Sequence, residues 1–341
     1  MSTAKYLVAG LSISFMLFSC KKTMSYDIMG DTGTKFFTNN PAAGNAPVNS
    51  ISYSIINIPN TAGSGLVNLS TNVPATIKFP VYSTRPVTEA VTITATLDNT
   101  LIAKYNADHN TNYAAFPTGV LNTDMLVAHI AKDTTASSDS ITVTSNPASL
   151  NLLTGTAYMA PILLTTVSSP SAGTITTATT QVTYIIVNAE QRRIKFLATT
   201  ADVIGALLTP RTAWTALYNT PPTTVGSIFD GSTATFNRWI ASPVQIDVNM
   251  QATQNVTGIR LLTSTSATYV PTQVDVYLSN DGITFDKIGS PLKANLTYAS
   301  TYNYILFYKP IPAKYIRLMM YYVTNTNTQN YRMVEFDVYG N

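Results

Sequence analysis

The sequence has 341 residues, which favours two or more domains, and only 11% of them are charged. The formal net charge of +3 is small for this length, and the longest basic clusters are Lys21-Lys22 and Arg192-Arg193, so nucleic-acid binding has little electrostatic support. Cys20 is the single cysteine. The chain therefore cannot form an internal disulfide, and its stability must come from core burial.

The N-terminal segment has the pattern of an export signal. Lys5 is the only charge in residues 1–19, and an apolar run extends from Leu7 to Phe18. This run is too short for a permanent transmembrane helix, which needs ~20 apolar residues. The small Ser19 stands before Cys20, an arrangement that resembles the bacterial lipobox, in which the cysteine is lipidated and becomes the first mature residue. We predict that residues 1–19 are a lipoprotein signal peptide and that Cys20 is the lipid anchor; the alternative is an ordinary signal peptide with a chance cysteine.

Such an anchor implies an outer-membrane location. We favour the cell surface over the periplasmic face, but both stay open because Lys21-Lys22 stands where surface-exported lipoproteins often carry an acidic cluster. Residues 20–50 contain scattered glycine, asparagine and proline without a sustained period, so we expect a flexible tether.

Short strand-like runs begin at about residue 51. Val91–Leu97 alternates apolar residues with threonine, the pattern of a half-buried strand, and residues 184–187 are also strand-like. Turn residues separate these runs at intervals that suit a β-sandwich over residues 51–188. Residues 189–194 are expected to be a linker.

The remainder, residues 195–341, contains further strand patterns and no long amphipathic helix. Residues 201–208 are expected to form at most two helical turns. Strands are expected at 244–248, 259–263, 273–278, 304–308, 315–320 and 334–339. The whole chain is therefore predicted to be all-β.

An ordered set of short motifs spans about 145 residues of this C-terminal part. They are IFDG (228–231), Thr235 with Trp239, PVQIDV (243–248), VTGIRL (256–261), VDVYLSNDGITF (274–285), AKYIRL (313–318) and EFDVYG (335–340). The set resembles the discoidin domain, also called the coagulation factor 5/8 type C domain, a family that includes the family 32 carbohydrate-binding modules. The resemblance implies a jelly-roll β-sandwich with ligand loops at one end. In that family the tryptophan usually sits two positions after the threonine, whereas three residues separate Thr235 from Trp239 here.

A fainter set of motifs lies in the first half. It consists of KYN (104–106), Asn112-Tyr113, Phe116-Pro117 and YMAPI (158–162). The set resembles an N-terminal domain of unknown function in Bacteroidetes surface lipoproteins from glycan-uptake loci. That resemblance implies an immunoglobulin-like β-sandwich in front of the discoidin-type domain.

The discoidin resemblance also implies a structural calcium site. In sugar-binding members the loop that matches Asp230, Ser232 and Thr235 commonly holds the ion, helped by a glutamate that matches Glu335. Calcium prefers about six to eight hard oxygen ligands, which carboxylates, hydroxyls and main-chain carbonyls supply. The alternative is an Asx-turn at Asp230 and an exposed or ion-paired Glu335.

Predicted glycan contacts lie in the loops. Sugar rings pack their C–H groups on aromatic faces and need polar partners for their hydroxyls, so aromatic, arginine and asparagine residues in loops are the candidates. They are Arg238, Trp239, Tyr269, Tyr302, Asn325 and Tyr331. Packing against the core is the alternative for any of the aromatic residues.

Enzyme chemistry has little support in the sequence. His109 and His129 do not have a metal-ligand spacing, and neither a Gly-x-Ser-x-Gly elbow nor a phosphate-binding loop is present. The acidic residues fall mostly in turns, without the clustered motif of chitinase-like hydrolases.

We therefore predict a non-catalytic lipoprotein that binds a neutral oligosaccharide or polysaccharide, because charge is scarce and tyrosines number 20. One alternative is an adhesive or structural surface protein whose discoidin domain binds a protein. Another is an accessory subunit of an outer-membrane glycan transporter complex.

Lipidation at Cys20 predicts a change of fractionation. The Cys20→Ser variant should move from the membrane to the soluble fraction, because the acyl chains that hold the protein are lost. Detergent-free fractionation with immunoblotting measures this, and Ser25→Ala, changed just after the predicted cleavage site, is the control that should stay with membranes. Membrane partitioning of Cys20→Ser equal to the wild type would show that the lipobox prediction is wrong.

Overall fold

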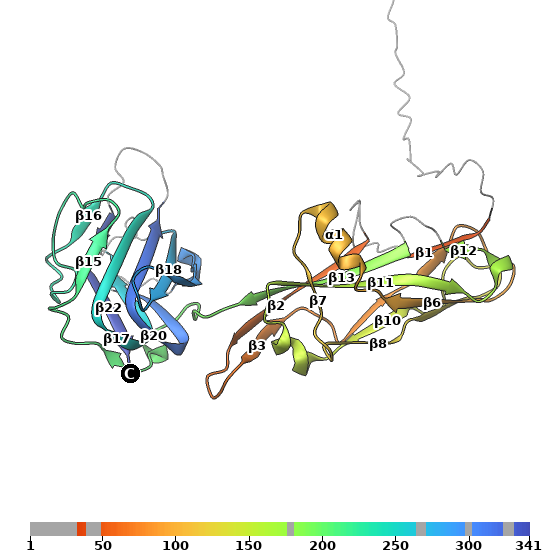
Figure 1. Ribbon diagram of the computed structural model, residues 1–341, viewed down its shortest axis with the longest axis horizontal. Coiled ribbons are helices and arrows are strands. Elements are labelled where there is room, and N and C mark those ends of the chain that lie inside the picture. Colours follow the sequence, from red (N-terminus) through yellow and green to blue (C-terminus); the bar gives the residue numbers. More distant parts are fainter. Residues whose placement is uncertain (1–32, 39–48, 176–180, 264–270, 297–301, 323–330) are drawn as a thin grey trace, which may run out of the picture.

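The computed structural model describes residues 33–38, 49–175, 181–263, 271–296, 302–322 and 331–341. Within them the chain forms two β-sheet domains placed end to end (Figure 1), which confirms the predicted all-β fold. Cys20 and the predicted signal peptide lie outside the described residues. In the described part of the chain, no helix is long and apolar enough to cross a membrane.

The N-terminal domain is a sandwich of one large sheet and two small ones. Its strands are β1 (Lys35–Thr38), β2 (Ser50–Pro59), β3 (Leu66–Thr71), β4 (Thr76–Phe79), β5 (Val81–Ser83), β6 (Val91–Leu97), β7 (Ala114–Ala115), β8 (Leu121–Met125), β9 (Val127–Ile130), β10 (Ile141–Ser145), β11 (Ala157–Val167), β12 (Thr174–Ile175) and β13 (Val182–Gln191). The large sheet has the order β3-β2-β13-β11-β6-β9, with β7 beside β11, and the small sheets have the orders β4-β10-β8 and β12-β1-β5. Short 3-10 helices occur at Pro147–Leu152 and Pro170–Ala172.

Alternating burial builds the core between these sheets. Ile93 in β6 and Ile185 in β13 face Ile141 in β10, and all three belong to one buried cluster. Phe36 of β1 joins the same cluster, because β1 pairs with β5 and β12. Residues 35–38 were expected to belong to the flexible tether, and that part of the prediction is wrong: the Phe36-Phe37 pair supplies apolar side chains that a tether lacks.

A helix that the sequence did not predict lies on the outer face of the large sheet. In α1 (Leu101–His109) only Ile102 is buried, and it packs against Met159 and Ile186. Asn106, from the first-half motifs, fixes the return of the chain: its side chain accepts from the N–H of Tyr113 (2.9 Å) and donates to the Tyr113 carbonyl (2.9 Å). Asn106 and Tyr113 of the first-half motifs therefore have a structural role: they hold the chain after α1 against the helix.

The C-terminal domain is a jelly roll built on two long bent strands. Its strands are β14 (Ala206–Leu207), β15 (Thr215–Tyr218), β16 (Asn237–Trp239), β17 (Val244–Leu262), β18 (Gln273–Ser279), β19 (Asp286–Gly289), β20 (Asn303–Tyr321), β21 (Tyr331–Met333) and β22 (Glu335–Gly340), with 3-10 turns at Thr200–Asp202 and Lys293–Asn295. The first half of β17 pairs with β15 and the second half with β22, while β20 follows β17 along both halves. Each long strand therefore contributes to both layers around one core.

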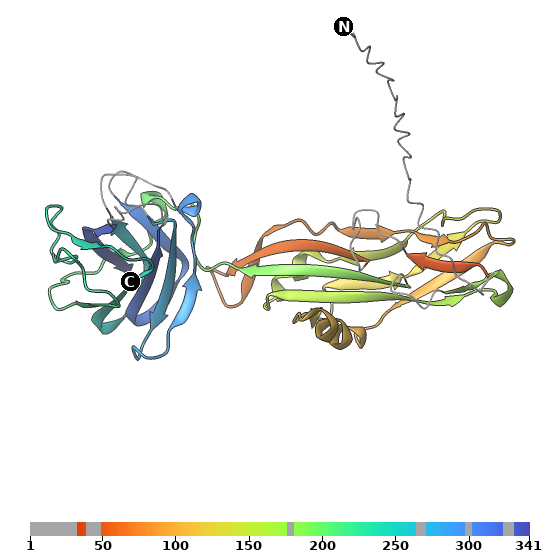
Figure 2. The same cartoon turned by 90° about the horizontal axis from the view of Figure 1, so that it is seen from above.

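The prediction of a linker over residues 189–194 is wrong for residues 189–191, which belong to β13, where Ala189 is buried in the N-terminal core. The chain that follows is extended and hydrogen bonded to both domains. The N–H of Arg192 donates to the Asn57 carbonyl of the N-terminal domain (2.8 Å), and the Arg193 carbonyl accepts from the N–H of Tyr308 in β20 (3.0 Å). Ile194 continues beside Phe307. Lys309 adds a side-chain bond from its Nζ to the Gly63 carbonyl (2.7 Å). Figure 2 shows the strand path crossing from one domain to the other, with β1 at the far end of the N-terminal domain.

Ile194 gives this junction a measurable contribution to stability. Its side chain is 2% exposed and belongs to the C-terminal core, where a Cβ on Gly289 would come within 2.8 Å of it. Ile194→Ala should therefore destabilise the C-terminal domain by about 2–4 kcal/mol, the usual cost of truncating a buried isoleucine.

Urea unfolding followed by tryptophan fluorescence measures this loss, because Trp214 and Trp239, the two tryptophans of the chain, both lie in the C-terminal domain. Leu197→Ala is the control, since Leu197 is 60% exposed and should cost about 0.5 kcal/mol or less. Equal stability losses in the two variants would contradict the assigned role of Ile194.

Candidate functional site

One end of the C-terminal domain gathers most of the described candidate residues. There β16 pairs with β21, so that Arg238 lies opposite Arg332, and Thr224 forms a bridge on the other side of Arg238. The N–H of Tyr322, just after β20, lies 3.3 Å from the Ser242 hydroxyl and closes this end. We call it the loop end, defined by residues 220–243 and β21; in Figure 1 it lies on the side of the domain away from the linker.

Trp239 does not face this surface. Its side chain is 0% exposed, its indole N–H donates to the Thr220 carbonyl (3.0 Å), and its ring lies 5.4 Å from that of Tyr218. The prediction that Trp239 contacts a glycan is therefore wrong, because the whole side chain is buried and its N–H is bonded inside the domain. Asn237, two positions earlier in β16, is buried on the same side and donates to the Tyr218 hydroxyl (2.7 Å).

Arg238 lies on the opposite, outer side of β16, because side chains alternate along a strand. The flanking Phe236 and Ile240 have the same parity, and Ile240 is 60% exposed. The Arg332 guanidinium stacks over the Phe236 ring at 4.6 Å from its centroid. Phe236 and Ile240 were absent from the predicted contacts, although their two-residue spacing around Arg238 would have placed them on its face.

The other predicted contacts are placed differently or not at all. Tyr302 precedes β20, and its ring lies 4.1 Å below the guanidinium of Arg260. Tyr269 and Asn325 lie outside the described residues. The backbone of Tyr331 is in β21 opposite Trp239, while its side chain is outside what the structure describes.

The four predicted calcium ligands come together. Asp230 starts a turn at Gly231 (φ +73°), in which its Oδ1 accepts from the N–H of Ser232 (2.9 Å), and this bond holds the pKa of Asp230 below its usual range. The Thr235 hydroxyl donates to Asp230 Oδ2 (2.9 Å) and lies 3.4 Å from the carbonyls of Ser227 and Ser232. Carboxylate, hydroxyl and carbonyl oxygens therefore share one small region.

Glu335 of β22 is the fourth of the predicted calcium ligands. It is 1% exposed, and burial raises its pKa to about 7 although Arg211 donates to its Oε2 (2.9 Å). Its carboxyl group also contacts that of Asp230, and this contact is a hydrogen bond only when one of the two is protonated. Among the described residues, Glu335 Oε1 is buried without a donor.

A buried ion network supports Glu335. Asp337 in the same strand accepts from Arg211 Nη1 (2.5 Å) and from Arg260 Nε (2.6 Å). Two guanidinium groups thus hold two carboxylates, which leaves one Glu335 oxygen facing Asp230. In the described part of the chain no three His, Cys, Asp or Glu side chains form a metal-binding group, so a cation here depends on the neutral oxygens as well.

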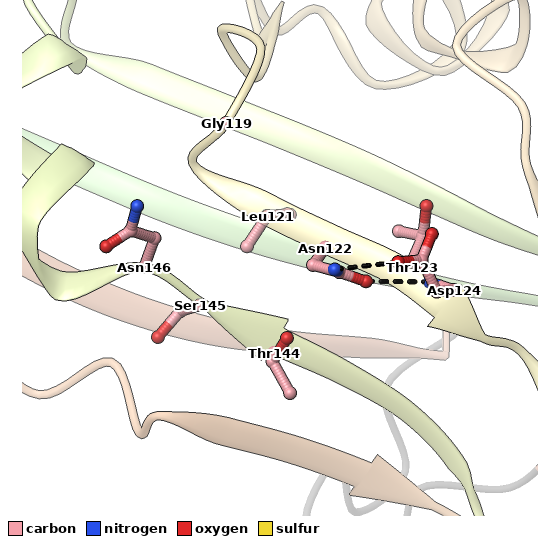
Figure 3. Close-up of a pocket in the computed structure, with 8 residues that line it drawn as sticks. All are labelled: Gly119, Leu121, Asn122, Thr123, Asp124, Thr144, Ser145 and Asn146. Carbon is pink, nitrogen blue, oxygen red and sulfur yellow. Dashed lines mark hydrogen bonds between the residues drawn. The ribbon is translucent and has the colours of Figure 1, made fainter.

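A hollow lies in the N-terminal domain between β8 and β10 (Figure 3). It has a volume of about 470 Å³ and a largely polar lining that includes Asn122, Asp124 and Thr144. Its best-placed groups bond to each other: Asn122 Nδ2 donates to Asp124 Oδ2 (2.9 Å), and the N–H of Asp124 donates to Asn122 Oδ1 (2.8 Å). This arrangement stabilises the strand end and does not define a ligand.

Comparison with protein families identifies both domains. Residues 51–171 match a family model described as an N-terminal domain, and residues 211–336 match the F5/8 type C domain. The C-terminal domain is thus an F5/8 type C, or discoidin, domain behind a separate N-terminal family domain, as the sequence motifs predicted. No curated protein matches the sequence.

Three solved structures illustrate the similarity. A two-domain protein of unknown function from Bacteroides fragilis is 15% identical, with 90% of this chain and 94% of that chain covered and a TM-score of 0.49. The C-terminal domain of a Bacteroides fragilis chitobiase is 22% identical, covering 40% and 98%, with a TM-score of 0.33. A family 32 carbohydrate-binding module from Clostridium perfringens, solved with galactose, is 20% identical, covering 38% and 96%, with a TM-score of 0.33.

Proposed function

We propose that this protein is a non-catalytic glycan-binding lipoprotein of the cell envelope, anchored to the outer membrane through Cys20 and displayed at the cell surface. The observation that carries the proposal is the F5/8 type C domain at residues 211–336, a family that includes carbohydrate-binding modules. Its described loop end supports the proposal, because apolar and hydrogen-bonding groups lie side by side there.

The loop end has the chemistry that sugar recognition needs. Ile240 (60% exposed) and Val225 (80% exposed) offer apolar surface to the C–H groups of a sugar ring. Thr224 and Arg238, paired across the same bridge, offer hydroxyl and guanidinium groups to its hydroxyls. Because water solvates those hydroxyls well, we expect a single site to bind with a Kd of roughly 0.01–1 mM.

The junction between the domains supports a display role. Cys20 precedes β1, which lies at the end of the N-terminal domain far from the C-terminal domain (Figure 2). The strand path through Arg192 and Arg193 then holds the C-terminal domain beyond the N-terminal one. The N-terminal domain would in this way act as a spacer between the anchor and the glycan-binding domain.

Two exposed isoleucines at opposite ends of the C-terminal domain test the site. Ile240→Ser at the loop end should weaken binding of the best hit from a glycan array by about three- to tenfold in Kd, because apolar contact is lost. Ile283→Ser is the matched control: Ile283 is 85% exposed and follows the far end of β18, so its loss should leave Kd unchanged. Isothermal titration of the full chain measures both variants.

The same array experiment includes a panel of surface and extracellular proteins. Binding to a protein with no glycan hit would support the adhesive alternative and contradict the glycan-binding proposal. Equal glycan affinity of the two variants would show that the binding site does not lie at the loop end.

We also propose that Asp230, Ser232, Thr235 and Glu335 belong to a structural calcium site. The buried Glu335 Oε1 without a described donor, facing the Asp230 carboxylate, is the observation that fits a cation. The Thr235 hydroxyl and the nearby Ser227 and Ser232 carbonyls add neutral oxygens of the kind that calcium uses. A bound calcium ion would neutralise two carboxyl groups that otherwise repel each other.

Calcium removal should therefore lower the melting temperature of the C-terminal domain. A ligand held only by the folded state stabilises it by about 2.7 kcal/mol at 100 times its Kd. Tryptophan fluorescence melts of the full chain, with calcium and with chelator, measure the effect.

Asp230→Asn should abolish the chelator effect while keeping the turn, because an amide oxygen still accepts the Ser232 N–H. Asp281→Asn is the control, since Asp281 Oδ1 accepts from the N–H groups of Ile283 and Thr284 (2.8 Å each) in another turn. Wild-type melting curves that coincide with and without chelator would leave Asp230 with a turn-forming role alone.

A further inference from the structure

Two arginines lie directly opposite each other at the loop end. Arg238 in β16 and Arg332 in β21 are cross-strand partners, so their side chains extend from the same face of the two-stranded ribbon. Their neighbours Asn237 and Met333 are buried, which places the arginines on the outer face. Like charges in directly opposite positions are unfavourable. An anion between them would turn this repulsion into attraction.

The Phe236 ring holds the guanidinium of Arg332 in an orientation that suits such an anion. The Arg332 guanidinium stacks on the Phe236 ring at 4.6 Å. Stacking uses the flat face of a guanidinium and leaves the N–H donors at its edge, which form a fork that matches the two oxygens of a carboxylate or sulfate. Both arginines make further interactions within the protein, and the five N–H donors of each guanidinium allow several partners at once.

Most acidic side chains of the domain's strands are engaged with other cations. Asp247 binds Arg317 (2.7 Å) and Asp275 binds Lys287 (2.9 Å). Glu335 and Asp337 bind Arg211, and Asp337 also binds Arg260. The loop end itself contains two arginines, Arg238 and Arg332, and one acidic residue, Asp230, so its formal charge is +1, although the chain as a whole has a low charge density.

We propose that the loop end binds an acidic glycan, whose carboxylate or sulfate group lies between Arg238 and Arg332. This inference rests on the proposed glycan-binding function and names the charge of the ligand for the same surface. It replaces the expectation of a neutral glycan, because that expectation averaged charge over the whole chain. The Thr224 hydroxyl, beside Arg238, is placed to contact a sugar hydroxyl next to the acidic group.

Three probes built from sugars of the same galacto configuration separate the sources of charge. They are oligogalacturonate, a sulfated galacto-oligosaccharide and the neutral galacto-oligosaccharide of the same length, each titrated calorimetrically into the full chain at low and high salt. At least one acidic probe should bind about tenfold or more tightly than the neutral probe at low salt, and this advantage should shrink at high salt because exposed charges are screened. Preference for oligogalacturonate assigns a carboxylate, and preference for the sulfated probe assigns a sulfate.

Arginine variants connect the preference to the pair. Arg238→Gln and Arg332→Gln should each reduce the affinity for the preferred acidic probe by about tenfold and leave affinity for the neutral probe unchanged. Arg332→Lys keeps the charge but loses the fork, so it should retain salt dependence with weaker binding. Lys132→Gln, an equal change of charge at an exposed position of the N-terminal domain, is the control and should bind as the wild type does. Tryptophan fluorescence melts confirm that each variant is folded.

The outcomes distinguish this inference from the proposed function. If the neutral probe binds as tightly as the acidic probes, or if both glutamine variants keep the acidic preference, the acidic-glycan inference is overturned while glycan binding stands. If no glycan on the array and none of the three probes binds, both proposals fall together.

Discussion

At the junction, the backbone is hydrogen bonded to the N-terminal domain at one residue and to the C-terminal domain at the next. The arrangement of the two domains depends on this change of partner. The N–H of Arg192 is bonded to the first domain, and the carbonyl of Arg193 is bonded to the second. Ile194 then enters the second core beside Phe307. A single extended segment is thus the last inner strand of one sandwich and an edge of the next. The direction of that segment sets where the loop end points.

The sequence predicted elements whose residues repeat with one simple period. In β6, Val91 and Ile93 are buried, whereas Thr92 between them and Thr94 after them are not, as the alternation indicated. It did not predict α1, because Ile102 is the only buried residue of that helix and leaves no 3.6-residue pattern. Trp239 was expected in a loop that the family motifs indicated. It is instead buried in β16, where Asn237 is bonded to Tyr218 and Gly226 by contacts that only the folded chain provides.

The residues of the candidate sites also differ in whether the sequence could predict them. Asp230, Ser232 and Thr235 are close in sequence, so a motif was enough to group them, and the same motif set added Glu335. The partners that decide the charge of these sites come from distant strands: Arg211 reaches Glu335, and Arg332 lies opposite Arg238. Cross-strand register determines these pairs, and a one-residue change in register would turn each side chain to the other face.

The position of β1 has a mechanical consequence. In the N-terminal domain β2, β11 and β13 run along the long axis of the molecule, β1 lies at one end, and the chain leaves toward the second domain at the other (Figure 1). A pull between the two ends of the protein would act parallel to these strands. The hydrogen bonds between neighbouring strands lie across the direction of that pull. Such a load shears many hydrogen bonds at once instead of opening them one after another. A domain with this geometry would resist extension if, as we propose, it is a spacer and the C-terminal domain holds a glycan polymer under load.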